Sequence, residues 1–336
     1  MNLGIIGLGY QGKRHLNNCF QLKQVNLVAV ADTSKNALEY ATKRGIKNVY
    51  TNYEDLLKNK QIDAVIISLP NFLHLNSAVK VAEAGKNILL EKPLARNLEE
   101  GKKILSSVDK NGVKLMMGYT MRFNPLLKGL QEKIFDGFFG EVQIAQATNI
   151  SNGPFTPRSD RIGPSPVPNW WFDKELVGGG ALLDLGIHMI DLFTWYFGEV
   201  ESVSSYLGYK LNMSLEDTAT CVIRFKRGPI ALVNAGWFSK DSIQSISIAG
   251  TSRCNLTMIS SKSKLRFIWN DLKKAIGIRT SSPSLSELRY FVDCVQNDVT
   301  PSPSGQEGLV DLQIISMAYK NASRLTEMNA WNNRGF

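Results

Sequence analysis

The stretch NLGIIGLGYQG, residues 2–12, decides the fold of the first part of the chain. A short apolar run ends in the spacing Gly7-x-Gly9-x-x-Gly12, and a helical pattern follows over about residues 13–23. In a strand–turn–helix unit these glycines allow a tight turn, approach of the backbone to a pyrophosphate, and close packing of helix on strand. The helix N-terminus then faces the phosphates. The alternative is a glycine-rich turn that binds nothing.

A carboxylate lies at the position where a dinucleotide-binding unit has one that contacts the ribose. A second apolar run, residues 25–31, closes with Asp32, twenty residues beyond Gly12. At the end of a second strand this carboxylate can accept hydrogen bonds from a ribose diol and disfavours the extra phosphate of NADP. We therefore expect NAD, while the nearby Lys35 keeps NADP open. The alternative role of Asp32 is a cap on the next helix.

Strand and helix patterns alternate through the first 120 residues, which predicts βαβ units and a parallel sheet. The next helix runs to about residue 45. Further strands are expected at about 47–50, 62–68, 87–90 and 114–118, with helices at 74–85 and 97–111.

Two polar stretches follow strands of this predicted sheet, LPNFLH at 69–74 and EKP at 91–93. A doubly wound sheet binds its ligand at the carboxyl ends of its strands. Lys92, held by the following proline, can point into that crevice; the alternative is a surface lysine in a turn. For His74 a cap or solvated helix start is favoured over catalysis. His15 is expected to be a partly exposed residue of the first helix.

Beyond residue 120 the pattern changes, which indicates a second domain. We divide the chain into a nucleotide-binding domain, residues 1–120, and a second domain, residues 121–336. The proline-rich stretch 151–177 is predicted to be an irregular loop, and its aromatic residues Trp170 and Trp171 argue against disorder. Helices are expected at 124–136, 284–297 and 305–326, and strands, suited to an antiparallel sheet, at 141–150, 200–209, 217–226, 229–237, 243–249, 253–259 and 264–269.

The stretch GGGALLDLGIHMIDLFTWYF, residues 178–197, predicts an apolar, buried helix. On a regular α-helix Asp184, His188, Asp191 and Trp195 share one narrow face. Buried carboxylates beside a histidine are costly unless paired or used. Asp184 and His188 are therefore a satisfied core pair or an acid/base pair lining a pocket. The opening glycines are expected to let the chain pass close to substrate and cofactor.

Composition limits the function classes. The 336 residues are 43% hydrophobic and 21% charged, as in a soluble globular protein. The net charge of +9 is scattered, without a basic run or a nucleic-acid-binding motif, so we expect no nucleic-acid partner. Uninterrupted apolar runs are too short to cross a bilayer, and the N-terminus lacks the basic region of a signal peptide. Four widely spaced cysteines fit free thiols, so we expect a cytoplasmic protein with no membrane partner.

Taken together, these motifs resemble the Gfo/Idh/MocA family of NAD(P)-dependent oxidoreductases. The resemblance covers essentially the whole chain and implies an α/β Rossmann domain, a doubly wound parallel sheet, followed by an α+β domain with a large open, mostly antiparallel sheet. It also implies a homodimer or homotetramer formed through the outer face of that open sheet. The matching stretches are GLGYQG at 7–12, Asp32, LPNFLH at 69–74, AGKNILLEKPLA at 84–95, GYTMRFNP at 118–125, GGGALLDLGIHMIDL at 178–192 and AYKNASR at 318–324.

Hydride transfer between nicotinamide and a secondary alcohol needs a base for the hydroxyl proton and a group that stabilises charge on oxygen. His188 is the best base, Asp184 can orient its imidazole, and Lys92 can donate to the substrate oxygen. In the family, the matching positions form the catalytic set. Asp191 either braces the histidine or is structural. A zinc site is not expected, because the chain has three histidines and no clustered cysteines.

We expect a dehydrogenase or reductase acting on a hydroxyl or keto group of a sugar, with a slight preference for an anionic sugar or nucleotide sugar. The alternatives are a cyclitol (inositol) dehydrogenase and a non-catalytic dinucleotide-binding sensor. The substrate-loop residues, including Arg161, could instead pack the interdomain hinge. Expected substrate contacts are Lys92, Arg122, Asn124, Arg158, Trp170, Trp171, Asp184 and His188. Expected cofactor contacts are Gly7, Gly9, Tyr10, Gln11, Gly12, Asp32, Pro70, Asn71, His74, Glu91 and Lys92.

Overall fold

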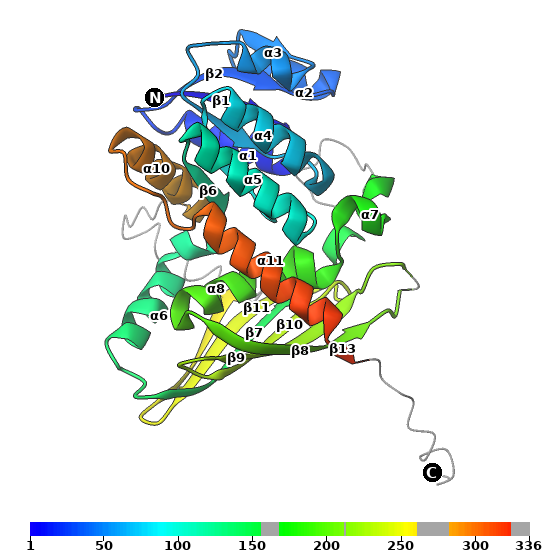
Figure 1. Ribbon diagram of the computed structural model, residues 1–336, viewed down its shortest axis with the longest axis vertical. Coiled ribbons are helices and arrows are strands. Elements are labelled where there is room, and N and C mark those ends of the chain that lie inside the picture. The colour runs from blue at the N-terminus through cyan, green and yellow to red at the C-terminus, as the bar shows by residue number, and fades with distance from the viewer. Residues whose placement is uncertain (156–167, 212, 261–281, 324–336) are drawn as a thin grey trace.

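The computed structural model describes residues 1–155, 168–211, 213–260 and 282–323. In this part of the chain two sheets lie one above the other, each with its own helices (Figure 1). The expected arginines 158 and 161 and the expected strand at 264–269 lie outside the described residues.

The N-terminal sheet has six parallel strands in the order β3-β2-β1-β4-β5-β6. This is the doubly wound order, and it confirms the predicted Rossmann domain. The chain reverses its winding direction between β1 and β4, and doubly wound sheets bind their ligands at the carboxyl ends of the strands at such a point. The elements are β1 (Asn2–Ile6), α1 (Tyr10–Cys19), β2 (Asn26–Ala31), α2 (Lys35–Thr42), β3 (Asn48–Tyr50), α3 (Tyr53–Leu57), β4 (Ala64–Ile67), η1 (Asn71–Leu73), α4 (His74–Glu83), β5 (Asn87–Glu91), α5 (Leu98–Asn111) and β6 (Leu115–Gly118).

Local signals in the sequence fix these helix ends. Asn97 caps α5 by accepting a hydrogen bond from the Glu100 N–H, and Gly112 ends the helix with a φ of 62°. Helix α1 begins at Tyr10 rather than near residue 13, because Gly9 is extended and leads directly into the helix. The glycine motif is therefore itself the helix N-terminus.

The C-terminal sheet has seven strands in the order β12-β11-β7-β10-β9-β8-β13. The pairs β7–β10 and β8–β13 are parallel and the others antiparallel, which confirms a mostly antiparallel sheet. Its strands are β7 (Val142–Ile150), β8 (Val200–Gly208), β9 (Thr218–Phe225), β10 (Ile230–Gly236), β11 (Ile243–Gly250), β12 (Cys254–Ser260) and β13 (Ala322–Ser323). The remaining helical elements are η2 (Thr120–Phe123), α6 (Pro125–Phe135), η3 (Gly153–Phe155), η4 (Asn169–Phe172), α7 (Lys174–Val177), the π-helical turn η5 (Leu182–Gly186), α8 (Ile187–Phe197), α10 (Pro283–Gln296) and α11 (Gly305–Lys320).

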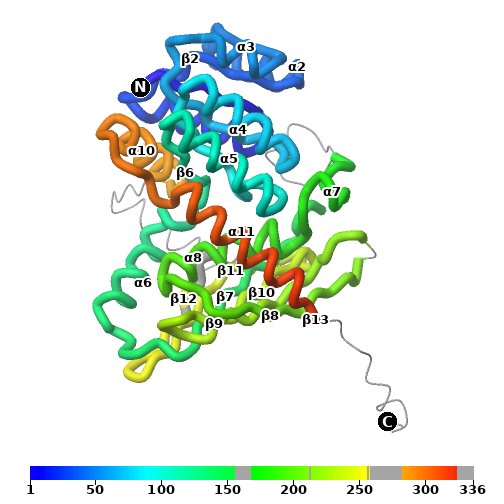
Figure 2. Tube along the Cα trace, in the orientation of Figure 1, coloured from blue at the N-terminus to red at the C-terminus, as the bar shows by residue number. Residues whose placement is uncertain are grey.

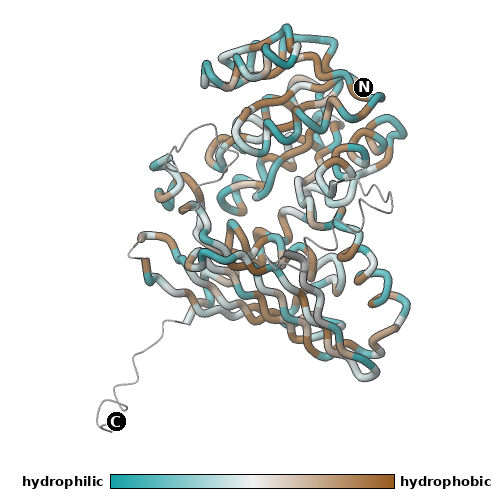
Figure 3. The backbone as a smooth tube through the Cα atoms, turned by 180° about the vertical axis from the view of Figure 1, so that it is seen from behind, coloured by the Kyte–Doolittle hydropathy of each residue, from teal (hydrophilic) through white to brown (hydrophobic). Residues whose placement is uncertain are grey.

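Helices cover one face of the C-terminal sheet. Ala147, Val233 and Cys221 stand side by side on β7, β10 and β9 and are fully buried on this face, where α8 and α11 lie. On the other face the neighbours Ile144 and Ile230 are exposed. None of the described helices lies over this outer face in Figure 2, and the view from behind in Figure 3 shows hydrophobic residues along the strands. The sheet is open on one side.

The chain returns to the N-terminal domain after the C-terminal sheet. Leu288, Phe291 and Val292 of α10 join the core that includes Leu16 of α1. Helix α11 then crosses from β6 to β8 and contacts both domains (Figure 1). The boundary at residue 120 stays a prediction, and both domains share these last helices.

One helical segment, Lys174–Phe197, has the length and composition of a membrane span. However, 72% of its most apolar window is buried inside the protein. It is the central helix of the C-terminal domain, as the all-round apolar pattern predicts.

Candidate active site

The glycine motif forms an open cradle at the switch between β1 and β4. Gly7 has a φ of +88°, and a Cβ there would lie 2.5 Å from the Ser68 carbonyl oxygen. A Cβ at Gly12 would lie 1.9 Å from the Gly7 carbonyl oxygen, so these two glycines permit close packing. A Cβ at Gly9 would meet none of the described residues within 4 Å, so space is open there. With no acidic residue and no side-chain cap in its first turn, the α1 N-terminus fits a pyrophosphate.

Asp32 lies beside this cradle. Its Oδ2 accepts a hydrogen bond from the Leu8 N–H at 2.5 Å, and its Oδ1 accepts one from the Ser34 N–H at 2.7 Å. The carboxylate therefore ties the glycine loop to the end of β2. Because it is only half-buried, lone pairs remain for a ribose diol. Tyr10 and Gln11 lie next to the loop, exposed and half-buried, respectively. These positions fit a bound dinucleotide.

The LPN loop after β4 contacts the second domain. The Asn71 side-chain amide donates to the Val177 carbonyl at 2.9 Å, and the preceding Pro70 is half-buried. His74 is fully buried, with ring nitrogens 2.8 Å and 2.9 Å from the carbonyl oxygens of Pro93 and Leu69. Burial lowers the pKa of His74. The expected solvated helix start is therefore wrong, and this position does not support direct cofactor contact. His74 instead braces the LPN loop against the loop that carries Lys92.

Lys92 and Asp184 meet across the crevice between the domains. The Lys92 ammonium donates to Asp184 Oδ1 at 2.7 Å and to the Asp184 carbonyl oxygen at 2.8 Å. Trp237, which directly follows β10, donates its indole N–H to Asp184 Oδ2 at 3.2 Å. Although burial raises the pKa of Asp184, the Lys92 charge and hydrogen bond hold it below its usual value. The pair is charged at neutral pH.

A π-helical turn separates the polar residues of the central helix into two groups. The Ile187 N–H bonds to the Leu182 carbonyl, five residues back. Within this turn, the Lys92 ammonium donates to the Asp184 carbonyl and the Asn149 amide to the Leu185 carbonyl. Such turns add a residue to the helical repeat and shift the faces that follow. The predicted single face is therefore wrong.

Further along the helix, Asp191 and Trp195 contact Arg122 rather than Lys92. Arg122 donates from Nε and Nη2 to Asp191, and its guanidinium lies 5.4 Å from the Trp195 ring centroid. Arg122 also donates from Nη1 to Glu307 Oε1 at 2.5 Å and is 5% exposed. Of the two roles expected for Asp191, bracing the histidine or a structural role, these contacts support the structural one. The burial of Arg122 does not support its expected contact with substrate.

His188, the second residue of α8, lies close enough to Lys92 and Asp184 for their charges to act on its imidazole. Burial and the Lys92 charge lower the pKa of His188 to about 3, against the opposing effects of Asp184 and Glu91. Both Asp184 carboxylate oxygens are bonded elsewhere, so the expected orientation of the imidazole by Asp184 is not what the structure shows. Among the described residues, no group bonds to the buried Nδ1 of His188. The imidazole is therefore neutral at neutral pH.

The glycines at 178–180 permit contact with protein rather than with substrate. A Cβ at Gly178 would lie 2.7 Å from the Arg96 carbonyl oxygen, and one at Gly180 would lie 2.0 Å from that of Glu216. The buried Glu216 carboxylate accepts hydrogen bonds from the Gly180 and Leu182 N–H groups at 3.0 Å and 3.1 Å. The glycines seat the start of the central helix on this carboxylate, which corrects the role expected for them.

The other expected substrate residues have structural contacts. Asn124 caps α6 by accepting a hydrogen bond from the Leu126 N–H at 3.0 Å. Trp170 stacks on Trp171 and meets the edge of Phe72 from the N-terminal domain at 5.8 Å. Packing of this tryptophan between the domains matches the hinge alternative.

Four residues of this region carry no motif in the sequence: His15, Asn149, Glu216 and Trp237. His15 is 1% exposed, with Nε2 2.9 Å from Glu91 Oε1, so the predicted partial exposure is wrong. His15 lies one helical turn before the apolar Cys19, and this spacing could have indicated that His15 shares the buried face of the helix. The other three bond to the central helix from strands or loops distant in sequence, which no local pattern reports.

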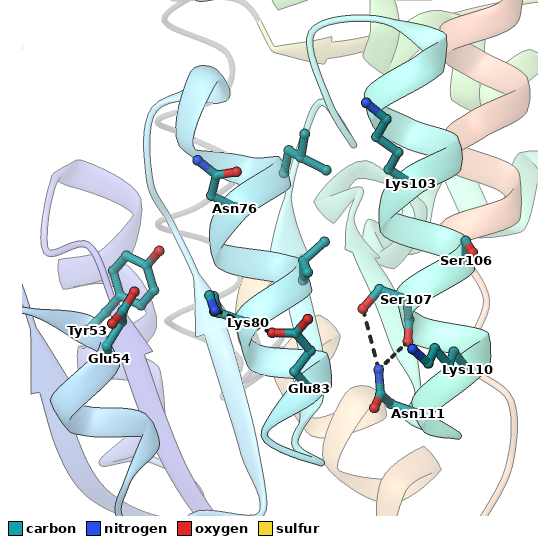
Figure 4. A pocket seen from close by; sticks show the side chains of 12 residues that line it. Tyr53, Glu54, Asn76, Lys80, Glu83, Lys103, Ser106, Ser107, Lys110 and Asn111 are labelled. Carbon is teal, nitrogen blue, oxygen red and sulfur yellow. Dashed lines mark hydrogen bonds and ion pairs between the residues drawn. The ribbon is translucent and has the colours of Figure 1, made fainter.

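A separate groove of about 630 Å³ lies on the N-terminal domain, between α3, α4 and α5. Figure 4 shows Lys80, Lys103 and Lys110 around it, together with Glu83, which pairs with Lys80 at 3.5 Å. None of the expected catalytic residues lines it. The candidate active site is therefore the domain junction around the Lys92–Asp184 pair.

A Rossmann domain with an open phosphate cradle, facing a lysine–aspartate pair and a neutral histidine, defines a two-domain, dinucleotide-dependent oxidoreductase. The N-terminal part, residues 1–119, matches the family model described as "Oxidoreductase family, NAD-binding Rossmann fold". Residues 128–253 match the "GFO/IDH/MocA C-terminal domain".

Relatives agree with this match. Oxidoreductase P35 of Formosa agariphila is 31% identical over 235 residues, 68% of this chain and 70% of that protein. Myo-inositol 2-dehydrogenase of Thermotoga maritima is 26% identical, with 96% of both chains aligned. The solved structure of levoglucosan dehydrogenase with NADH and levoglucosan has a TM-score of 0.79 at 22% identity, covering 96% of this chain and 97% of that one. The chain belongs to the Gfo/Idh/MocA oxidoreductase family, as its motifs predict, and is an NAD(P)-dependent dehydrogenase that acts on CH–OH groups.

Proposed function

We propose that the protein oxidises a ring hydroxyl of an uncharged cyclic sugar or cyclitol, or reduces the corresponding ketone, with NAD as the preferred cofactor. The observation that carries this proposal is the meeting of Lys92, Asp184 and His188 at the crevice between the domains. The names of the relatives, myo-inositol 2-dehydrogenase and levoglucosan dehydrogenase, support the same substrate class.

Lys92 is suited to hold the substrate oxygen. An ammonium group has three N–H donors, and Asp184 accepts two of them. The third is left for the hydroxyl that reacts, and its charge stabilises that oxygen as the proton leaves. Asp184 holds the Lys92 ammonium in place.

His188 is suited to take the hydroxyl proton. Its imidazole is neutral at neutral pH and so has a lone pair to receive the proton, while the burial and the Lys92 charge that keep it neutral also weaken it as a base. The proton passes from the substrate oxygen to the imidazole, and the alcohol carbon becomes a carbonyl. A bound nicotinamide supplies the hydride acceptor for this step. The open space at Gly9 and the carboxylate of Asp32 are the features of this chain that would hold the dinucleotide.

An uncharged substrate is favoured over the anionic one first expected. Arg122, one of the cations on which that preference rested, is buried against Asp191 and Glu307. Lys92 is already paired with Asp184. In the described part of the crevice, these two cations therefore offer no unpaired charge to a carboxylate or phosphate.

A turnover screen tests the proposal. Purified protein is assayed by NADH absorbance with inositols, aldoses, anhydrosugars and nucleotide sugars, each with NAD and with NADP. We expect turnover of an uncharged cyclic polyol with NAD, and its loss in Lys92→Met and His188→Asn but not in the surface variant Lys110→Met. Tight NADH binding without turnover of any substrate would instead support the dinucleotide-binding sensor.

We further propose a homo-oligomer formed through the uncovered face of the C-terminal sheet. Ile144, Ile230 and Tyr206 on this face are 53%, 47% and 50% exposed, and side chains of this kind commonly line interfaces. Light scattering after size exclusion tests this. We expect a dimer or tetramer that Ile230→Glu dissociates and Lys110→Glu does not; a monomeric wild-type protein would exclude it.

Cytoplasmic location also stays a proposal. All four cysteines are unpaired, three of them buried, which fits a reducing compartment.

A further inference from the structure

The second oxygen of the Asp184 carboxylate is held by a residue without a known part in the reaction. Lys92 takes Oδ1, and the Trp237 indole takes Oδ2. We propose that Trp237 is a positioning residue, whose N–H keeps Asp184 turned toward Lys92 and away from His188. This inference rests on the proposed dehydrogenase activity.

The indole is fixed on several sides. Trp237 is 1% exposed, and its backbone N–H donates to the Asp217 carbonyl at 2.8 Å. A Cβ at Gly153 would lie 2.3 Å from the indole Cδ1, so this glycine leaves room for the ring edge. The ring also packs with Val177 and Leu215. A donor held this rigidly is preorganised for its acceptor and needs no reordering during the reaction.

Asp184 has a competing partner that it does not use. His188 follows it by about one helical turn, and Nδ1 of this histidine bonds to none of the described residues. If the indole donor were lost, Oδ2 would be an unsatisfied oxygen of a buried carboxylate, which is costly. The carboxylate would then gain by turning to His188. The indole therefore divides the site into a charged Lys92–Asp184 pair and a neutral histidine.

The orientation of Asp184 determines the electrostatic potential at the His188 imidazole. The charged groups that act on its imidazole are Lys92, Asp184 and Glu91, and Glu91 is itself bonded to His15. Turning Asp184 toward the imidazole would favour the protonated form, in which His188 cannot accept the substrate proton. It would also withdraw the partner that holds Lys92. Displacement of Lys92 lowers turnover, and the raised pKa extends the protonated form of His188 to higher pH; neither change alters the dinucleotide cradle.

Trp237→Phe tests the inference, because it keeps an aromatic ring and removes only the N–H donor and the smaller part of the indole. We expect kcat to fall about tenfold, the size of one lost hydrogen bond to a charged group. The KM for the dinucleotide stays within about twofold, and the acidic limb of kcat/KM moves to higher pH. The matched control is Trp195→Phe, whose ring lies 5.4 Å from the Arg122 guanidinium and bonds neither Asp184 nor Lys92, and which leaves both values unchanged.

A double variant separates positioning from general damage to the fold. If Trp237 acts through Asp184, adding Trp237→Phe to Asp184→Asn changes the residual rate by less than about twofold. An equal loss in both backgrounds, or a wild-type pH profile in Trp237→Phe, overturns the inference.

A spectroscopic test does not depend on the substrate. The chain has six tryptophans, and the indole N–H signal missing from the Trp237→Phe spectrum of ¹⁵N-labelled protein belongs to Trp237. We expect Asp184→Asn to shift this signal and to leave that of Trp195 in place. An unmoved signal overturns the hydrogen bond and the inference with it. Absence of turnover in the wild-type protein would count against the proposed function alone.

Discussion

In the interior of the N-terminal domain, the Nε2 of His15 lies 2.9 Å from the Oε1 of Glu91. Glu91 directly precedes Lys92 in the chain. His15 belongs to α1, whose first turn forms the phosphate cradle, and Glu91 ends β5. Burial raises the pKa of Glu91, but the hydrogen bond and charge of His15 lower it below its usual value. The pair therefore links the cofactor helix to the strand that positions the lysine.

Removing the donor of this pair should destabilise the domain. His15→Leu leaves a buried carboxylate unpaired, and we expect the free energy of unfolding to fall by about 2–4 kcal/mol in urea titrations. His15→Gln keeps an N–H donor and should lose clearly less. Equal losses in the two variants would show that shape, rather than the hydrogen bond to Glu91, is what His15 contributes.

Cofactor choice should depend on Asp32. Asp32→Ala removes the proposed ribose acceptor, so we expect NAD affinity to fall about 10- to 100-fold, as for a lost hydrogen bond to a charged group. Asp32→Asn still offers an oxygen to the Leu8 N–H and separates the loop contact from the charge. NADP affinity should fall less than NAD affinity in both. NADH fluorescence titration measures this, with the surface variant Asp55→Ala as control; unchanged NAD affinity in Asp32→Ala would refute the ribose role.

The buried ion pair of Arg122 should dominate the stability of the domain junction. Arg122→Met leaves Asp191 without its bidentate partner, and we expect the free energy of unfolding to fall by about 3–5 kcal/mol. Adding Asp191→Leu removes the unpaired carboxylate and should recover part of the loss.

Arg224→Met is the matched control, because Arg224 and its partner Glu201 are 63% and 52% exposed. Solvent screens such a pair, so a loss below about 1 kcal/mol is expected there. Similar losses for Arg122→Met and Arg224→Met would contradict the assigned role of Arg122.

The parallel sheet could be predicted from the sequence because four of its strands, β1, β4, β5 and β6, are short, mostly apolar and buried runs. Such runs are buried on both faces, and the glycine motif marks the first of them. Lys92 could be placed for a related reason: it directly follows such a strand, and the carboxyl ends of parallel strands share one edge.

The faces of the central helix could not be predicted in the same way. The π-helical turn that separates Asp184 from Asp191 holds carbonyls that Lys92 and Asn149 bond from other elements. A helical wheel assumes a constant 3.6 residues per turn and takes no account of donors from other elements. Burial of Arg122 was equally hidden, because its partners at 191 and 307 lie far along the chain.

Protonation of His188 gives a test of the site that needs no substrate. Burial and the Lys92 charge lower the pKa of His188 from 6.5 to about 3, so its imidazole is neutral in the folded protein at any pH above about 5. The chain has only three histidines, and His188→Asn identifies the corresponding ring signal in NMR titrations. In the wild type we expect no titration of this ring near pH 6.5. In Lys92→Met, where the positive charge is gone, its midpoint should move to higher pH; Lys110→Met should leave it unchanged.

The same pKa sets the direction of the stability change with pH. Below pH 6.5 the unfolded chain takes up a proton at His188 that the folded protein does not bind until about pH 3. The contribution of this histidine to stability is therefore complete above pH 6.5 and is lost progressively as pH falls toward 3. Urea titrations across this window should show a weaker acid dependence in His188→Asn than in the wild type. An identical acid dependence, or a wild-type ring that titrates near pH 6.5, would mean that His188 is solvated and charged, and its role as the neutral base would fail.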